Sequence, residues 1–191
     1  MNQNLRLLAS AVALLLSPLP ALAASSPDTG QGIDAVTGID VMTSTVMQKG
    51  QSSISGLGLR VRIQSPRVIK EIEFMPSIEY WRSYTTAQPY DIRATRKDAT
   101  LGTDVRYNFQ SGAWKPYLGA GMAIHFLSTR VDAPSFGVND DTNSVIKGGL
   151  AVLGGVSFGL AGKLDNFLEI KYHHLSDYRQ LKFNWGLAYN L

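Results

Sequence analysis

Apolar and polar residues alternate along most of this chain, and the last eleven residues show the pattern most clearly. Apolar or aromatic side chains stand at every second position from Leu181 to Leu191, with polar or small residues between them. Successive side chains of a β-strand point to opposite faces, so a period of two predicts a strand with one apolar face. The C-terminus is therefore predicted to be a strand.

The same alternation recurs upstream, and with the C-terminal segment it predicts eight strands. The weakest pattern is the first, from Ile33 to Met47, and the sequence leaves open whether it closes a barrel. Short turns are expected at 64–68, 111–113 and 162–165, whereas longer polar loops are expected at Ser83–Arg93 and Thr129–Thr142. The other upstream strands are expected near residues 57–63, 72–80, 101–109, 114–126, 146–160 and 168–172.

The first 23 residues have the pattern of a secretory signal peptide. Arg6 supplies a positive charge, residues 7–16 form an apolar run, and Ala21-Leu-Ala23 gives a cleavage pattern of small residues. The run is shorter than the roughly 20 apolar residues that a membrane-spanning helix needs. We expect cleavage after Ala23, a flexible leader at 24–32 and one β-barrel domain at 33–191.

Composition excludes several classes of function. Eighteen basic against fifteen acidic residues give a net charge of +3, too mild for a dedicated nucleic-acid-binding protein. The chain has no cysteine, which excludes disulfides, thiolate zinc sites and a cysteine nucleophile. No nucleotide-binding loop is present, and neither a cofactor nor a metal site is predicted.

The alternation fits two opposite barrels, because periodicity does not say which face is outside. A secreted, soluble ligand-binding barrel turns its apolar face inward, whereas a transmembrane barrel turns it toward lipid. Many segments reach the roughly 9–11 residues that cross a bilayer at a tilt, and aromatic residues gather near segment ends. These features favour an all-β, eight-stranded antiparallel up-and-down transmembrane β-barrel.

Such a barrel is only wide enough for side chains to fill it, so a lumen closed by paired charges is predicted. His125 is expected there as a polar filler. The charged residues expected to face the lumen are Arg60, Arg62, Glu71, Glu73, Glu79, Asp104, Arg106, Lys115, Lys147, Glu169, Lys171 and Lys182.

The final segment, Asn184-Trp-Gly-Leu-Ala-Tyr-Asn-Leu191, resembles the C-terminal signal of outer-membrane barrels. Residues 115–121 and 167–174 resemble the small outer-membrane β-barrel proteins of the opacity-protein kind. The resemblance implies a Gram-negative outer membrane and recognition of the last strand by the barrel-assembly machinery. Leu191 stands where that family most often has Phe.

One enzymatic alternative comes from His174-Leu-Ser176, whose spacing resembles the outer-membrane lipid A deacylases. Both side chains share the face predicted to meet lipid, where a histidine base could activate a serine nucleophile. That chemistry needs a third group to orient the imidazole. The resemblance implies a glutamate on the final strand, and this sequence has no glutamate after Glu169. The loop carboxylates Asp140 and Asp141 are interpreted as a solvated loop tip.

The favoured hypothesis is a non-enzymatic outer-membrane barrel with a structural or surface-interaction role. Its expected partners are outer-membrane lipid, lipopolysaccharide and a surface partner at loops 83–93 and 129–142.

Overall fold

The computed structural model describes residues 35–48, 53–65, 68–87, 92–109, 112–176 and 179–191. These residues all belong to one compact unit, Gly32–Leu191. The predicted signal peptide (1–23) and leader (24–32) lie outside the described residues. No helix among the described residues is long and apolar enough to cross a membrane.

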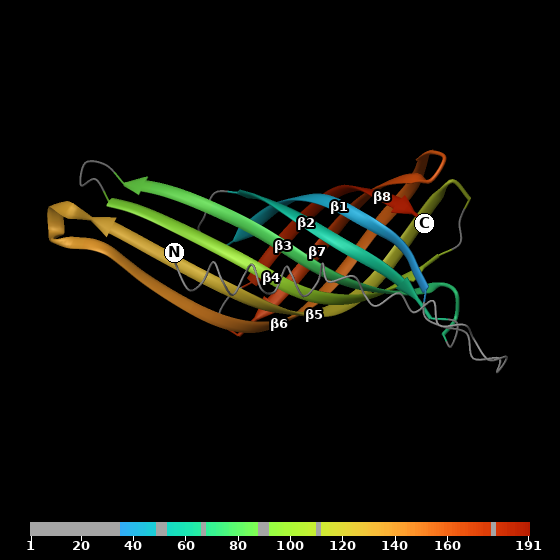
Figure 1. The fold of residues 1–191 in the computed structure, drawn as a ribbon, viewed down its shortest axis with the longest axis horizontal. Helices are drawn as coiled ribbons and strands as arrows, with labels where there is room; N and C mark the ends of the chain where they lie inside the picture. The colour runs from blue at the N-terminus through green and yellow to red at the C-terminus, as the bar shows by residue number, and fades with distance from the viewer. Residues whose placement is uncertain (1–34, 49–52, 66–67, 88–91, 110–111, 177–178) are drawn as a thin grey trace, which may run out of the picture. The chain divides into compact units, whose positions relative to one another are not determined.

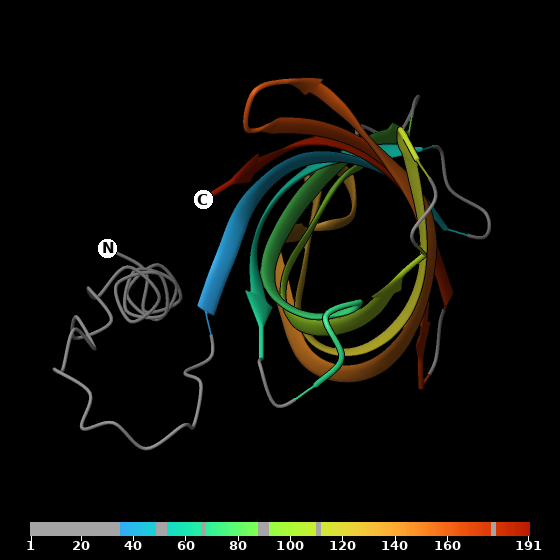
Figure 2. The same cartoon turned by 90° about the vertical axis from the view of Figure 1, so that its right-hand side faces the viewer.

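Eight antiparallel strands form a closed barrel in which each strand pairs with its neighbours in the sequence (Figures 1 and 2). The fold class predicted from the sequence is confirmed. The strands are β1 (Ala35–Gln48), β2 (Ile54–Gln64), β3 (Ile72–Ala87), β4 (Ile92–Asn108), β5 (Trp114–Ala133), β6 (Val138–Ala161), β7 (Leu164–Leu175) and β8 (Arg179–Asn190).

The weak first strand closes the barrel. β1 pairs with β2 along most of its length and with β8 from Gly38 opposite Asn190 to Gln48 opposite Gln180. Its alternation is weak because Gly, Ser and Thr replace larger residues at several positions. Pairing with two strong neighbours supplies the backbone hydrogen bonds that such a segment would not hold alone.

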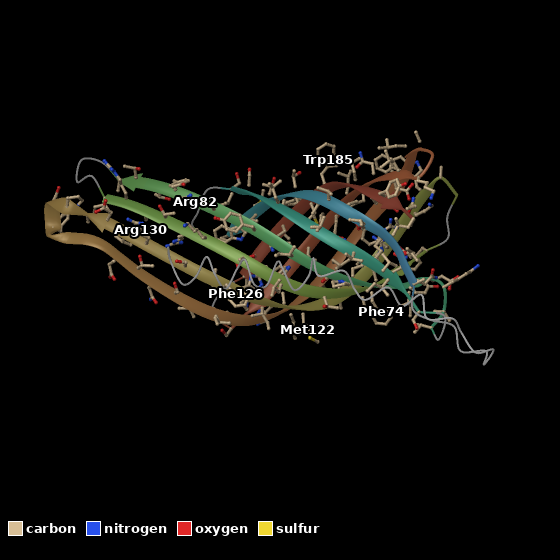
Figure 3. The ribbon with its side chains drawn as sticks, viewed as in Figure 1. Phe74, Arg82, Met122, Phe126, Arg130 and Trp185 are labelled. Atoms are coloured by element: carbon tan, nitrogen blue, oxygen red, sulfur yellow. The ribbon has the colours of Figure 1, made fainter. Side chains whose placement is uncertain are left out.

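The distribution of side chains is the reverse of that in a soluble protein. Met122 and Trp185, for example, point away from the barrel (Figure 3). Leu57, Met122 and Ile146 on the outer surface are 65%, 66% and 68% exposed. Arg60 and Lys182 in the interior are 0% exposed. An apolar exterior and a polar interior characterise a transmembrane barrel, so the expected face assignment holds and the soluble-carrier alternative is wrong.

The two predicted long loops are mostly strand, which corrects the sequence analysis. β3 continues to Ala87 and β4 begins at Ile92, while β5 continues to Ala133 and β6 begins at Val138 after a short 3-10 turn, Pro134–Phe136. Ladder pairs such as Arg93 with Asp132 run through these segments. The alternation fades there because neither face of the sheet needs to be apolar once the strands leave the lipid.

These extensions form a sheet that projects beyond the barrel at one end (Figure 1). The β2–β3 ladder ends at Gly56 and Trp81, and the β6–β7 ladder ends at Gly149 and Leu175. Beyond those pairs only β3, β4, β5 and β6 continue among the described strands. We call this part the projecting sheet; it consists of residues 82–87, 92–97, 127–133 and 138–148.

The opposite end, where β1 begins and β8 finishes, carries the tight turns. Gly112 and Gly162 both have positive φ, 54° and 58°, a conformation that glycine adopts without steric cost. Gly162 and Lys163 alone join β6 to β7, within the short turn that the sequence predicts at 162–165.

Candidate functional site

The centre of the lumen holds an ion pair between two strands that are not neighbours. Arg60 on β2 binds Glu169 on β7 through two contacts, Nη2 to Oε1 at 2.8 Å and Nη1 to Oε2 at 3.0 Å. The Tyr117 hydroxyl and the Asn184 amide also donate to this carboxylate, at 3.1 and 2.8 Å. Donors from β2, β5 and β8 thus converge on one buried carboxylate of β7.

A second network lies between that pair and the projecting sheet. The Lys171 ammonium is 2.6 Å from Asp104 Oδ2 and 3.5 Å from Glu79 Oε1. Lys182 donates to the other oxygen of Glu79 at 2.6 Å. Each of these four side chains is at most 3% exposed, so all four charges are removed from water together.

A third set of pairs lies toward the end with the tight turns. Arg62 Nε is 2.8 Å from Asp40, and Arg106 makes two contacts of 2.7 Å with Glu73. Lys115 was also predicted to face the lumen, but its side chain is 52% exposed. It shares the inward parity of the buried Tyr117, as predicted, but it is the second residue of β5 and lies at the rim, 3.7 Å from Asp165 Oδ2.

A histidine layer lies toward the projecting sheet. His125 Nδ1 is 2.9 Å from Asp98 Oδ2 and 3.0 Å from Thr100 Oγ1, and His125 Nε2 is 3.2 Å from His173 Nδ1. Gln180 donates to Asp98 at 3.3 Å. All these side chains are buried, so His125 is held on both ring nitrogens, as expected of a polar filler.

Sequence reasoning missed Asp98, although the signal was available. Asp98 lies in β4 with the same parity as Asp104, and both are at most 1% exposed. Extending the inward face of that strand toward its start would have found it. The predicted strand began at Leu101, so Asp98 was not assigned to either the lumen or the outer face of the barrel.

The residues of the enzymatic alternative lie on the outer surface. His174 and Ser176 are both exposed, at the end of β7. The residues opposite His174 are Leu150 and Arg179, neither of which is a carboxylate. Neither His174 nor Ser176 makes a side-chain hydrogen bond or ion pair with another described residue. Asp177, which follows the pair, lies outside the described residues.

Metal ligands do not gather in the part of the chain that the structure describes, where no group of three or more His, Asp or Glu side chains could hold an ion. The predicted loop tip at Asp140 and Asp141 belongs to β6 instead, where Asp141 pairs with Val131. A further concave feature is a cavity of about 860 Å³ where the projecting sheet leaves the barrel, lined by residues such as Trp81, Arg96 and Lys147.

A closed barrel with an apolar exterior and an ion-paired interior defines an outer-membrane barrel protein. The sequence pattern of the outer membrane protein beta-barrel domain family matches residues 9–190. The chain belongs to this family and is a protein of the Gram-negative outer membrane. No curated protein sequence matches it.

Solved structures with the same fold include three outer-membrane proteins. Neisserial surface protein A is 19% identical with a TM-score of 0.62, over 84% of this chain and 100% of that one. A major outer membrane protein from Thermus thermophilus is 14% identical with a TM-score of 0.58, over 82% and 100%. Ail from Yersinia pestis is 16% identical with a TM-score of 0.56, over 83% and 98%. At these identities the likeness shows the fold alone.

Proposed function

We propose that this barrel is a non-enzymatic component of the outer membrane whose lumen is closed and whose projecting sheet meets partners outside the cell. The observation that carries the proposal is the set of ion pairs that cross the lumen. Arg60–Glu169 joins β2 to β7, Lys171–Asp104 joins β7 to β4, and Lys182–Glu79 joins β8 to β3. Opposite walls are therefore tied together at three places.

Closure of the lumen follows from the cost of breaking such pairs. Removing one partner from a buried pair leaves an uncompensated charge and costs about 3–5 kcal/mol. An ion passing along the lumen would have to displace several of these contacts. Purified protein in a planar lipid bilayer should therefore give no steady conductance steps. Ohmic steps that scale with protein added, in the absence of any porin contaminant, would refute a closed lumen.

The projecting sheet is proposed to lie on the extracellular side. In barrels of this kind the short turns face the periplasm and the longer connections face outward. Here the tight turns, the start of β1 and the end of β8 lie at one end, and the projecting sheet lies at the other (Figure 1). The outward-facing extension is long and polar, which suits contact with an external partner.

Lipopolysaccharide is the proposed lipid partner of the outer surface. Arg82 and Arg130 face outward on the projecting sheet, beyond the apolar surface that includes Phe126 and Met122 (Figure 3). Lys97 lies directly opposite Arg82 across the β3–β4 ladder. No carboxylate of a described residue pairs with Arg82 or Lys97. Two adjacent cations at headgroup height favour the phosphates of an anionic lipid.

Two further parts of the proposal concern export and assembly. Cleavage after Ala23 should leave a mature protein that begins at Ala24, and N-terminal sequencing of protein from the membrane tests it. A different mature N-terminus would refute the cleavage site without affecting the barrel itself. Recognition by the barrel-assembly machinery is proposed for the last strand, from Asn184 to Leu191.

A further inference from the structure

A cavity of about 860 Å³ opens at the end of the barrel from which the projecting sheet extends. We call it the cup. Residues of β1 and of β3 to β8 line it, so nearly the whole circumference of the barrel contributes to its wall. Its volume lies within the roughly 300–1,000 Å³ of small-molecule sites. The cup is therefore large enough for a ligand of one or two sugar rings.

The wall of the cup is cationic. Arg96 and Lys147 are the cations on its inner wall, Lys97 and Arg179 border it from the outward faces of their strands, and no described lining residue carries a carboxylate. Arg96 and Lys147 belong to the inward faces of β4 and β6, as the alternation of burial along both strands indicates. Arg96 makes no side-chain hydrogen bond or ion pair with another described residue. Such a surface attracts an anion.

The carboxylate beneath the cup does not neutralise this charge locally. Asp98 is 0% exposed and already accepts from Thr100 and Gln180 and contacts His125. Its oxygens are thus directed into the buried histidine layer. An anion entering the cup would meet the guanidinium of Arg96 rather than the carboxylate of Asp98.

A polar row crosses the inner wall at the height of Arg96. Arg96 lies opposite Thr129 in the β4–β5 ladder, and Thr129 lies opposite Asn143 in the β5–β6 ladder. Strands are about 4.8 Å apart, so the row spans roughly 10 Å. A guanidinium, a hydroxyl and an amide in one line can bind a charged group and the neighbouring hydroxyls of a sugar.

The floor of the cup contains buried donors without an acceptor. Trp81 is 3% exposed and packs with Val46 and Ile54, yet its indole Nε1 has no hydrogen-bond partner among the described residues. The side-chain amide nitrogen of Gln48 is also buried and unsatisfied there. Both residues line the cup. Leaving a buried donor unpaired is costly, so a small shift of the side chains that cover these nitrogens would let acceptor oxygens of a ligand satisfy both.

We propose that the cup binds an acidic saccharide. Its carboxylate or sulfate group pairs with Arg96 and Lys147, its hydroxyls bind Thr129 and Asn143, and a ring or hydroxyl oxygen accepts from Trp81. The inference names the ligand class of the surface interaction proposed above and rests on that function, because the cup is accessible only if this end of the barrel faces outward.

The test is a calorimetric titration of the full mature chain, folded in detergent micelles, with matched saccharides. Digalacturonate and sulfated lactose are the acidic probes, and neutral digalactose and lactose are their controls. We expect the acidic probes to bind at least about tenfold more tightly than the neutral ones. R96Q and K147Q should each weaken acidic-probe binding about tenfold. R82Q, which removes the same charge from the outward face, should leave it unchanged.

Folding of each variant is checked by its heat-dependent gel mobility, so loss of binding is not confused with loss of structure. The proposal is overturned if the neutral sugars bind as well as the acidic ones, or if R96Q and K147Q bind like R82Q. It is also overturned if inorganic sulfate alone matches sulfated lactose, since the sugar would then contribute nothing. Recovery of the chain outside the outer membrane would instead refute the proposed function.

Discussion

Arg60 and Glu169 meet in a bidentate ion pair at the centre of the barrel, with Nη2 2.8 Å from Oε1 and Nη1 3.0 Å from Oε2. Both side chains are 0% exposed, and 109 positions separate them in the sequence. Bidentate geometry with additional donors is the arrangement that best compensates the desolvation of a buried pair. This pair joins two strands that share no backbone hydrogen bonds.

Reversing the charge at Glu169 should destabilise the barrel strongly. Glu169→Lys places a cation against Arg60 and removes the acceptor of Tyr117 and Asn184. We expect the free energy of unfolding to fall by about 3–5 kcal/mol, measured by urea unfolding in detergent micelles. The matched control is Asp141→Lys on the projecting sheet, whose side chain is exposed.

The charge swap Arg60→Glu with Glu169→Arg tests whether the two residues act as a pair. The double variant should recover a substantial part of the stability that each single variant loses, because the ion pair can re-form with opposite polarity. Additive losses in the double variant, or an unchanged unfolding profile for Glu169→Lys, would contradict the ion-pair account.

Glycine is required at position 186, where the buried Phe167 ring packs against the backbone of the neighbouring strand. A Cβ on Gly186 would lie 2.6 Å from Phe167 Cζ and would also meet the Val41 carbonyl oxygen. Gly186→Ala should therefore cost about 1–3 kcal/mol of stability through overpacking. Gly148→Ala is the control, since nothing lies within 4 Å of its Cβ position, and it should be neutral or slightly stabilising. Equal effects of the two substitutions on the unfolding midpoint would argue against this packing.

Lipopolysaccharide binding should depend on the outward-facing cations. Replacing both Arg82 and Arg130 by Gln removes two positive charges near the lipid surface, each worth about 1 kcal/mol of attraction. We expect lipopolysaccharide affinity, titrated against barrels in phospholipid nanodiscs, to fall about tenfold or more. The Arg96→Gln and Lys147→Gln pair, on the inner wall, should leave it unchanged. If the Arg96 and Lys147 substitutions weakened lipopolysaccharide binding and the Arg82 and Arg130 substitutions did not, the proposed contact on the outer face would be contradicted.

The non-enzymatic proposal is tested on the two residues of the lipid A deacylase alternative. Cells that express the native chain should retain fully acylated lipid A, and Ser176→Ala or His174→Ala should change nothing. The reason is that no described carboxylate lies opposite His174 to orient its imidazole. Mass spectrometry of extracted lipid A is the measurement. Loss of an acyl chain with the native protein but not with Ser176→Ala would establish an enzyme.

Sequence alternation was sufficient to predict the strands, because one apolar side chain in two is required wherever a strand crosses lipid. The outward face needed segment lengths and aromatic positions as well, and closure of the barrel by the weak first strand was left open. Alternation could not locate the ends of β3 to β6, since strands in water need no apolar face and their polar residues resemble loops. Alternation also could not predict which charged residues pair with one another in the lumen. Parity places Arg60 and Glu169 inside, but only the tilt and stagger of the strands bring those two together.

The same limit applies to the cup. Arg96, Thr129 and Asn143 lie in or beside segments that the sequence presents as two polar loops, and their shared inner face follows from the ladders that join β4, β5 and β6. Once strand pairing is known, their alternation is as regular as that of the barrel wall. The alternation was therefore present in the sequence, but without the strand pairing it could not show that these three residues share one face.

The central claim is that this chain is a closed barrel in the outer membrane, and one fractionation experiment tests it most directly. Full-length protein should be recovered with outer membranes, and its gel mobility should differ before and after boiling, because a folded barrel resists the detergent until heated. Recovery as a periplasmic protein that needs no detergent, with one mobility in both samples, would contradict the account.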